Sequence, residues 1–119
     1  MRVAIPVAGE SLEVFERTGQ APFFAVFDIK DDKSFELVEM RANQKHHHIH
    51  NDEVENDNEH LNEHINQVKF ISDCDYIFVK RVGKHMKEAL DTQNIEVKKF
   101  KKDDGVTAID YLNKFIGEM

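Results

Sequence analysis

The sequence predicts a three-layer α/β/α domain built on one mixed five-stranded sheet. Three observations favour this fold class: short apolar runs typical of strands, stretches in which apolar residues recur every three to four positions, and the alternation of the two in the second half of the chain. The elements follow in the order β-β-β-α-β-α-β-α. With 119 residues, 40% of them hydrophobic, the chain has the size and apolar content of one domain over 1–119.

The first half predicts an antiparallel meander of three strands. Residues 3–5 form a short apolar run, and Pro6 is expected to close it because proline has no N–H to continue a ladder. Residues 23–29 are rich in aromatic and β-branched side chains, as strands are. Over 35–40, Phe35 and Leu37 alternate with Glu36 and Val38, which predicts a strand with one buried and one exposed face. The polar residues 30–33 between them predict the turn of a hairpin.

The second half predicts helices that alternate with strands through right-handed crossovers. Apolar residues spaced at i, i+4 and i+7 predict a helix over 58–70, and the apolar run 76–80 predicts a strand covered on both faces. A second helix is expected after Gly83 and a strand over 95–100. A last helix with a period near 3.6 follows Gly105.

Charge and composition exclude several classes of protein. The net charge is -7, so a phosphate backbone is repelled and we expect no nucleic-acid partner. The basic run 98–102 is followed by Asp103 and Asp104, and we interpret it as a solvated turn. A single cysteine, Cys74, permits no intramolecular disulfide, and no apolar run approaches the roughly 18 residues of a membrane span. We therefore expect a cytoplasmic protein without a membrane partner.

Residues 42–58 form one chemically unusual segment, an acidic loop with almost no apolar side chain. It carries His46, His47, His48 and His50, and imidazole is the commonest protein ligand for transition metals. Extended backbone would point alternate histidines to one side, and a helical turn would bring His46 and His50 together, so either geometry permits chelation. The alternative is an acidic loop that merely tolerates its histidines.

His60 and His64 lie one turn apart on the predicted helix and are further candidate metal ligands, or else partly exposed helix residues. With Glu63 they match the H-x-x-E-H pattern of inverted zinc peptidases, in which the glutamate activates water. Such enzymes also need a third ligand and a substrate cleft, for which the sequence shows no context. A zinc-dependent hydrolase is therefore less favoured than a non-enzymatic metal site.

Two further residues have a candidate role. Cys74 precedes a predicted buried strand, and with no adjacent cation to depress its pKa we interpret it as a small side chain at the edge of the core. Gly83 lies between a strand and a helix, where unpaired N–H groups favour anions; a tight turn is the alternative. No phosphate-binding loop, nucleophile elbow or Ser-His-Asp arrangement is recognisable, so we expect no enzyme.

Four parts of the chain carry a family resemblance. They are Arg-Val-Ala-Ile-Pro-Val at 2–7, Gly-Gln-Ala-Pro-Phe-Phe at 19–24, the His-rich connection, and 73–77 with its continuation to Gly83 and Asn94-Ile95. In these parts the chain resembles the dinitrogenase iron-molybdenum cofactor biosynthesis family of NifX-like proteins and the C-terminal domain of NifB. The resemblance implies a ribonuclease-H-like motif, without nuclease activity, that binds or carries an iron-sulfur or iron-molybdenum cluster. It makes Gly19 and Gly83 the candidate cofactor-binding residues.

The chain departs from the family at one place. The family usually has a His-Phe-Gly-Arg-like run where this chain has Arg17-Thr18-Gly19-Gln20. The sequence therefore leaves two candidate functions for this protein. The first is a non-enzymatic carrier or accessory protein for such a cluster or a divalent transition metal, a monomer or weak homodimer with cofactor-assembly proteins as partners. The second is a protein-interaction module that has kept the fold and lost the cofactor.

Overall fold

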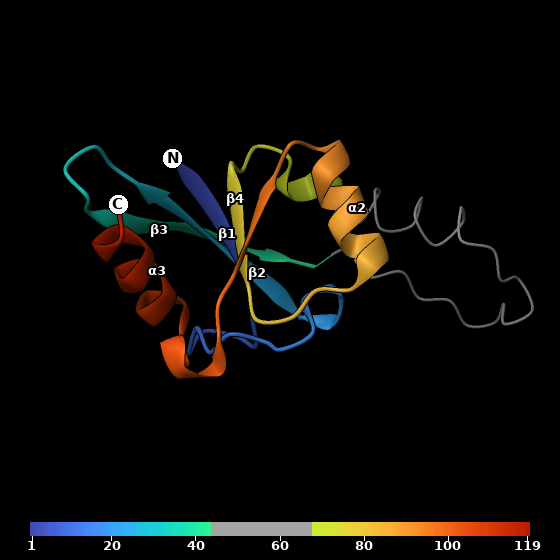
Figure 1. Cartoon of the computed structure of the whole chain (residues 1–119), viewed down its shortest axis with the longest axis horizontal. Coiled ribbons are helices and arrows are strands. Elements are labelled where there is room, and N and C mark those ends of the chain that lie inside the picture. The colour runs from blue at the N-terminus through green and yellow to red at the C-terminus, as the bar shows by residue number, and fades with distance from the viewer. Residues whose placement is uncertain (44–67) are drawn as a thin grey trace, which may run out of the picture.

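In the computed structural model, which describes residues 1–43 and 68–119, one sheet has the strand order β3-β2-β1-β4-β5 (Figure 1). Its strands are β1 (Arg2–Val7), β2 (Phe23–Ile29), β3 (Phe35–Ala42), β4 (Tyr76–Val79) and β5 (Glu96–Lys99). The β1–β2 and β2–β3 pairs are antiparallel, whereas the β1–β4 and β4–β5 pairs are parallel. The mixed five-stranded sheet is thus confirmed, while the ribonuclease-H-like motif stays a prediction.

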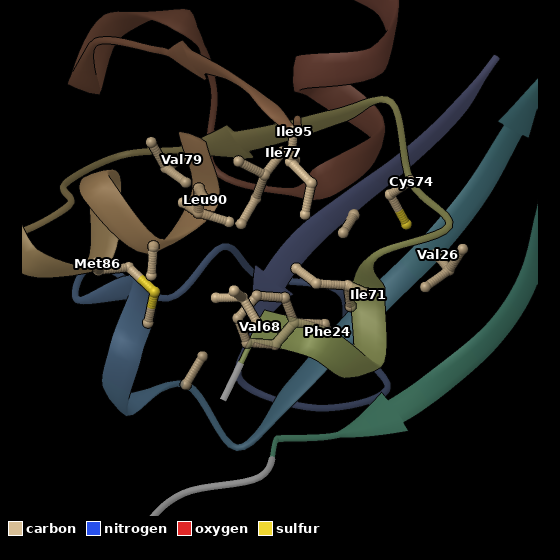
Figure 2. Close-up of a cluster of buried hydrophobic side chains, with 13 residues drawn as sticks. Phe24, Val26, Val68, Ile71, Cys74, Ile77, Val79, Met86, Leu90 and Ile95 are labelled. Carbon is tan, nitrogen blue, oxygen red and sulfur yellow. The ribbon is translucent and has the colours of Figure 1, made fainter. Parts of the chain in front are cut away.

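A helix covers each face of the sheet, because successive strand side chains point to opposite faces and both sets are apolar. Helix α2 (Lys84–Thr92) packs on one face, where Val26, Ile77 and Leu90 belong to one buried cluster (Figure 2). Helix α3 (Ala108–Gly117) packs on the other face. The cluster under α3 includes Val3, Phe27, Phe78, Tyr111 and Leu112. The predicted three layers are therefore present.

Pro6 does not close β1 as the sequence suggested. The strand continues to Val7, and Pro6 lies opposite Phe24 of β2. The Pro6 carbonyl accepts a hydrogen bond from the Phe15 N–H at 2.9 Å. Since the N–H and C=O of a strand residue point to the same side, the proline nitrogen also faces away from β2. The missing donor therefore costs the β1–β2 ladder nothing.

Strand β3 also differs from the prediction. Its register with β2 slips between Leu37 and Glu39, so Val38 is an extra residue of the kind found in a β-bulge. Leu37 and Val38 are 45% and 40% exposed, and the expected alternation of buried and exposed residues is lost. Ala42, expected in the loop 42–58, still pairs with Phe23. The rest of that loop from residue 44 onward lies outside the described residues.

The helix expected over 58–70 falls largely outside the described residues. Where the description resumes, Val68 has helical dihedrals and precedes the short 3₁₀ turn η2 (Lys69–Ile71). Val68 and Ile71 are buried in the cluster under α2 (Figure 2). This end of the segment is therefore fixed by packing against the sheet.

The other predicted elements are confirmed with small changes of boundary. The strand expected over 76–80 ends one residue earlier, and the strand over 95–100 is shortened to β5. Helix α2 starts directly after Gly83. Helix α3 starts after Thr107, whose hydroxyl accepts a hydrogen bond from the Asp110 N–H at 3.3 Å. None of the helices in the described ranges is long and apolar enough to cross a lipid bilayer.

Candidate functional site

A pocket of about 430 Å³ lies where β4 gives way to α2. One wall is formed by residues 17–20, which include the short 3₁₀ turn η1 (Thr18–Gln20). Residues 81–86, which run from the end of β4 into the first turn of α2, form the other wall. Ligands of open α/β sheets collect at the carboxyl ends of the strands, and the pocket has this position.

Thr18 fastens the two walls together. Its hydroxyl donates a hydrogen bond of 2.7 Å to the Arg81 carbonyl, and its N–H donates to the same oxygen at 3.3 Å. Thr18 is only 1% exposed, and Arg17 forms an isolated parallel bridge with Arg81. A buried hydroxyl with a short hydrogen bond holds its backbone firmly, since leaving it unpaired would be costly. The pocket is therefore built before any ligand arrives.

The structure brings both predicted glycines to this pocket. Gly83 has φ -77° and ψ 165°, a conformation open to any residue, and a methyl group added there would meet no described atom within 4 Å. Neither backbone strain nor crowding among the described residues therefore requires a glycine at 83. The Gly19 carbonyl accepts a hydrogen bond of 3.3 Å from the Asn43 side chain. The open space beside Gly83 lets a ligand approach the backbone closely.

The pocket is electropositive. Arg17, Arg81 and Lys84 line it, and the first turn of α2 contains no acidic residue. The first N–H groups of a helix have no partner within the helix, and the helix dipole adds partial positive charge there. No side chain caps α2 at Gly83. Arg81 pairs with Glu16 at 3.1 Å, but both side chains are more than 60% exposed and such a pair is weak. The arrangement therefore suits an anion.

The histidines predicted as metal ligands lie outside the described residues. They are His46, His47, His48, His50, His60 and His64, together with the Glu63 of the peptidase-like pattern. Within 1–43 and 68–119 no group of three or more His, Cys, Asp or Glu side chains could hold a metal ion. The remaining histidine, His85, lines the pocket. Asn43 is the last described residue before the histidine segment, and its side-chain amide donates to the carbonyls of Gly19, at 3.3 Å, and Ala21, at 2.7 Å. The first described range of the chain therefore ends, at Asn43, beside the wall of the pocket.

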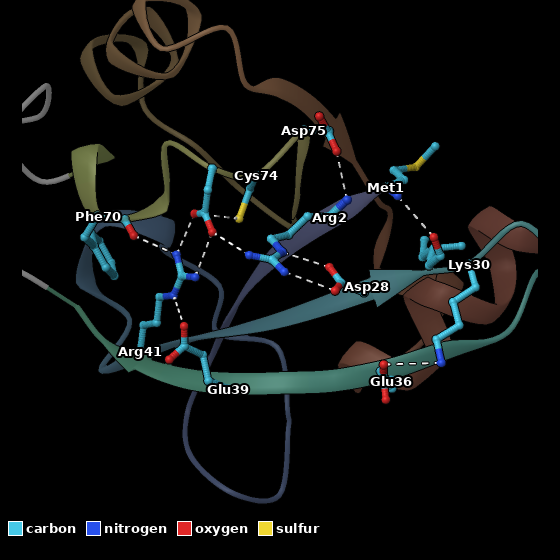
Figure 3. A network of polar contacts seen from close by, with 12 residues as sticks. Met1, Arg2, Asp28, Lys30, Glu36, Glu39, Arg41, Phe70, Cys74 and Asp75 are labelled. Atoms are coloured by element: carbon cyan, nitrogen blue, oxygen red, sulfur yellow. Dashed lines mark hydrogen bonds and ion pairs between the residues drawn. The ribbon is translucent and has the colours of Figure 1, made fainter.

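Cys74 lies at the opposite end of β4 and is only 4% exposed. Burial raises the pKa of its thiol to about 12, and the neighbouring Asp73 carboxylate acts in the same direction. Contrary to the sequence argument, cations are close: Arg2 and Arg41 lie nearby, but both donate to Asp73 at 2.7 to 2.9 Å (Figure 3). The interpretation of Cys74 as a side chain at the edge of the core therefore agrees with its burial.

In the basic run 98–102, Lys99, Lys101 and Lys102 are exposed, as expected for a solvated segment, but the run also has a second feature. Residues 99–102 line a second pocket of about 490 Å³ together with Lys80 and Arg81. Asp104 was expected to cancel part of this charge. Instead its carboxylate accepts a 2.7 Å hydrogen bond from the backbone N–H of residue 101 and pairs with Lys114 at 3.1 Å. The signal that would have revealed this pocket is topological, since the ends of two adjacent parallel strands meet.

The comparisons with known proteins agree with this fold. The chain matches the family model described as "Dinitrogenase iron-molybdenum cofactor" over residues 1–117. No curated protein matches it significantly. Several solved structures share its fold, among them the following three. The apo orange protein of Desulfovibrio gigas is 19% identical, with a TM-score of 0.62 over 98% of this chain and 88% of that one. A candidate NifB protein of Thermotoga is 22% identical, with a TM-score of 0.60 over 96% and 85%.

The third is a candidate dinitrogenase of Methanocaldococcus jannaschii, 18% identical, with a TM-score of 0.59 over 99% of this chain and 89% of that one. At these identities the solved structures show the fold alone. The family model covers nearly the whole sequence, including both walls of the pocket. This chain belongs to the dinitrogenase iron-molybdenum cofactor family.

Proposed function

We propose that this protein is a non-enzymatic carrier that binds an anionic metal-sulfur cluster or cluster precursor in the pocket between residues 17–20 and 81–86. The observation that carries the proposal is that Gly19 and Gly83 meet in one electropositive pocket at the start of α2. Membership of the iron-molybdenum cofactor family supports a metal-containing cargo. The helix N-terminus and the surrounding cations support an anionic one.

Each part of the pocket has a definite task in this proposal. Arg17 and Lys84 supply positive charge, and the absence of a side chain at Gly83 lets the cargo reach the N–H groups of α2. His85 offers an imidazole, a common ligand for transition metals. Thr18 keeps the walls at a fixed separation through its bond to the Arg81 carbonyl.

The single cysteine supports transient binding of the cluster over permanent storage of it. Protein-bound iron-sulfur clusters are normally held by several thiolates, whereas Cys74 is alone, buried and protonated. A cargo that keeps its own sulfur ligands is then held by charge, hydrogen bonds and imidazole groups. Such contacts break more readily than metal-thiolate bonds, which suits transfer to an assembly protein.

We further propose that the histidines of the 42–58 loop and its continuation are metal ligands for the same cargo, as the sequence predicts. These are His46, His47, His48, His50, His60 and His64. The anchoring of Asn43 on Gly19 supports this part of the proposal, because that residue leads into the histidine segment from the pocket wall. The two parts of the proposal are separable by mutation.

The test is an anaerobic titration of untagged protein with tetrathiomolybdate, a molybdenum-sulfur dianion, followed by visible absorbance and by metal analysis after gel filtration. We expect the Arg17→Gln/Lys84→Gln variant to bind at least about tenfold more weakly, since it loses two charge-assisted contacts. The matched control Lys30→Gln/Lys33→Gln removes two lysines from the turn between β2 and β3, where neither lines the pocket, and it should bind like wild type. Equal binding by the pocket variant and wild type would overturn the site.

A second titration tests the histidines. The His46→Ala/His48→Ala/His50→Ala variant should bind less metal per chain if those imidazoles are ligands. Unchanged stoichiometry would leave the pocket as the site and remove the loop from the proposal. The absence of binding by the wild-type protein would contradict the carrier function itself.

A protein-interaction module is the second candidate, and one observation favours it. Strand β3 lies at the edge of the sheet, and its bulge leaves Leu37 and Val38 exposed. Exposed strand edges pair readily with other chains. A complex with another protein that survives a chelator and is lost in Leu37→Ser/Val38→Ser would support this function; a complex unaffected by that change would dismiss this surface.

A further inference from the structure

The second pocket, of about 490 Å³, lies on the β5 side of the segment that leaves β4. Lys80 and Arg81 follow β4, and residues 99–102 run from the last residue of β5 into the next turn. The Phe100 N–H donates to the Val79 carbonyl at 2.8 Å, continuing the parallel pairing of the two strands. Backbone topology therefore holds these basic segments side by side.

The side chains that line this pocket carry more positive than negative charge. Five of its seven lining residues are Lys or Arg, and the single carboxylate, Glu16, is already paired with Arg81 at 3.1 Å. Within the part of the chain that the structure describes, Lys80, Lys99 and Lys102 take part in no ion pair. In a chain with a net charge of -7, such a gathering creates a local field that attracts anions.

Lysines on edge strands often serve another purpose, which is to prevent the sheet from pairing with a second sheet. That purpose accounts for Lys98, which lies on the edge strand β5 and pairs with Glu118 at 3.9 Å. It does not account for Lys80, because β4 is an interior strand. Nor does it account for Lys102, which lies beyond the end of β5.

The shape of the pocket favours a small ligand over a protein surface. Its volume falls within the range of about 300–1,000 Å³ that is usual for small-molecule sites. Phe100 is 4% exposed and its ring stacks on Tyr111 at a centroid distance of 4.3 Å, which gives the pocket a fixed aromatic base. Ammonium groups bind phosphate oxygens as point charges, and several together need a ligand with more than one negative group.

We propose that this pocket, lined by Glu16, Lys80, Arg81 and residues 99–102, is a separate binding site for a small molecule that carries two or more adjacent phosphate groups. It differs from the pocket between residues 17–20 and 81–86 in containing neither the start of α2 nor η1, and Arg81 alone lines both. The ligand is held by lysine ammonium groups at the ends of β4 and β5. The proposal does not depend on the nature of the metal cargo.

Calorimetric titration with sodium tripolyphosphate, at constant ionic strength and without divalent cations, tests this site. Wild type should bind with a stoichiometry of one. The Lys99→Gln/Lys102→Gln variant should bind roughly tenfold more weakly or worse. The control Lys30→Gln/Lys33→Gln, with the same change of net charge in the turn between β2 and β3, should stay within about twofold of wild type. A parallel titration with ATP distinguishes a nucleotide from an inorganic polyphosphate. Tighter binding of ATP than of tripolyphosphate indicates a nucleotide, and equal or weaker binding indicates a polyphosphate.

Three results would overturn the proposal. They are no binding of tripolyphosphate by wild type at millimolar concentration, equal weakening by the pocket variant and its control, and loss of tripolyphosphate binding in Arg17→Gln/Lys84→Gln. The last result would place the phosphate ligand in the first pocket. In the expected outcome, Lys99→Gln/Lys102→Gln still binds tetrathiomolybdate like wild type. The two sites can thus fail independently of each other.

Discussion

In the turn before β4 the charged side chains bind one another, whereas directly after β4 three cations, Lys80, Arg81 and Lys84, line pockets. The Asp73 carboxylate accepts hydrogen bonds from Arg2 at 2.8 Å and from Arg41 at 2.7 and 2.9 Å, and Arg2 also binds Asp28 (Figure 3). After β4, Arg81 has one exposed carboxylate partner at 3.1 Å. The two turns lie only one short strand apart and use charge differently.

The difference separates charges that hold the fold from charges available to a ligand. The Asp73 network ties β1, β2 and β3 to the turn that leads into β4, and the Arg41 side chain within it is only 17% exposed. Partly buried pairs of this kind contribute to stability, because each partner would otherwise be left desolvated. After β4, Lys80 and Lys84 take part in no ion pair among the described residues and the Arg81–Glu16 pair is exposed, so the fold itself gains little from these cations.

The largest effect expected from this contrast concerns Cys74. Burial raises the pKa of its thiol to about 12, so at pH 8 its thiolate fraction falls roughly a thousandfold below that of an ordinary cysteine. Iodoacetamide at pH 8 should therefore alkylate the folded protein at least about a hundredfold more slowly than the urea-unfolded protein. Mass spectrometry of timed samples measures both rates. Similar rates would show a reactive thiol before β4 and restore Cys74 as a possible cluster ligand.

The next effect compares the two ends of β4 directly. Asp73→Ala should lower the free energy of unfolding by about 2 kcal/mol, because it leaves Arg41 without its main partner; partial exposure of Asp73 keeps the loss below that of a fully buried pair. Glu16→Ala, which breaks the exposed pair with Arg81, should cost less than about 0.5 kcal/mol. Urea denaturation measures both. Equal losses would remove the distinction between the two ends.

Acid should weaken the end before β4 selectively. The guanidinium of Arg41, with burial opposing it and Arg2 assisting, holds the pKa of Asp73 well below its usual range. A carboxyl whose pKa is lowered by folding contributes stability above its unfolded value of about 4, and this contribution is lost as the pH falls toward the folded value. The deficit of Asp73→Ala should therefore be constant from pH 7 to about 5 and shrink below about pH 4. Urea midpoints of both proteins at several pH values test this; a constant deficit down to pH 2.5 would contradict the assigned pKa.

The elements around β4 were predictable because their signals are local. The apolar run of β4 and the spacing of Met86, Ala89 and Leu90 in α2 lie within a few residues of one another, and both predictions are confirmed. The sequence did not reveal the extra residue Val38 in β3. A bulge depends on how the neighbouring strand pairs, which the periodicity of one strand does not contain.

The candidate site was predictable only in parts. Gly19 and Gly83 were identified separately, but their meeting depends on the bond from Thr18 to Arg81, which are 63 residues apart in sequence. The same holds for the second pocket, where residues 99–102 join Lys80 through strand pairing. Contacts of this range follow from topology, so the sequence correctly indicated an exposed basic run but not its meeting with Lys80.

The smallest effect on cargo binding, and the most informative one for the end after β4, is expected from Gly83→Ala. Gly83 precedes α2 in an extended conformation and has free space around its missing Cβ, so alanine fits without strain. Alanine lowers the conformational entropy of the unfolded chain, which stabilises the fold. Glycine is the better N-cap residue of a helix, so the change also destabilises it. These opposing effects leave a net change in the free energy of unfolding below about 1 kcal/mol. Binding of tetrathiomolybdate should nevertheless weaken severalfold, because the new methyl group occupies space beside the N–H groups of α2.

Gly9→Ala, at a second glycine with no described atom within 4 Å of the added Cβ, is the matched control and should bind like wild type. If Gly83→Ala also binds like wild type at unchanged stability, the cargo does not approach this backbone, and the charges after β4 then act on it from a greater distance.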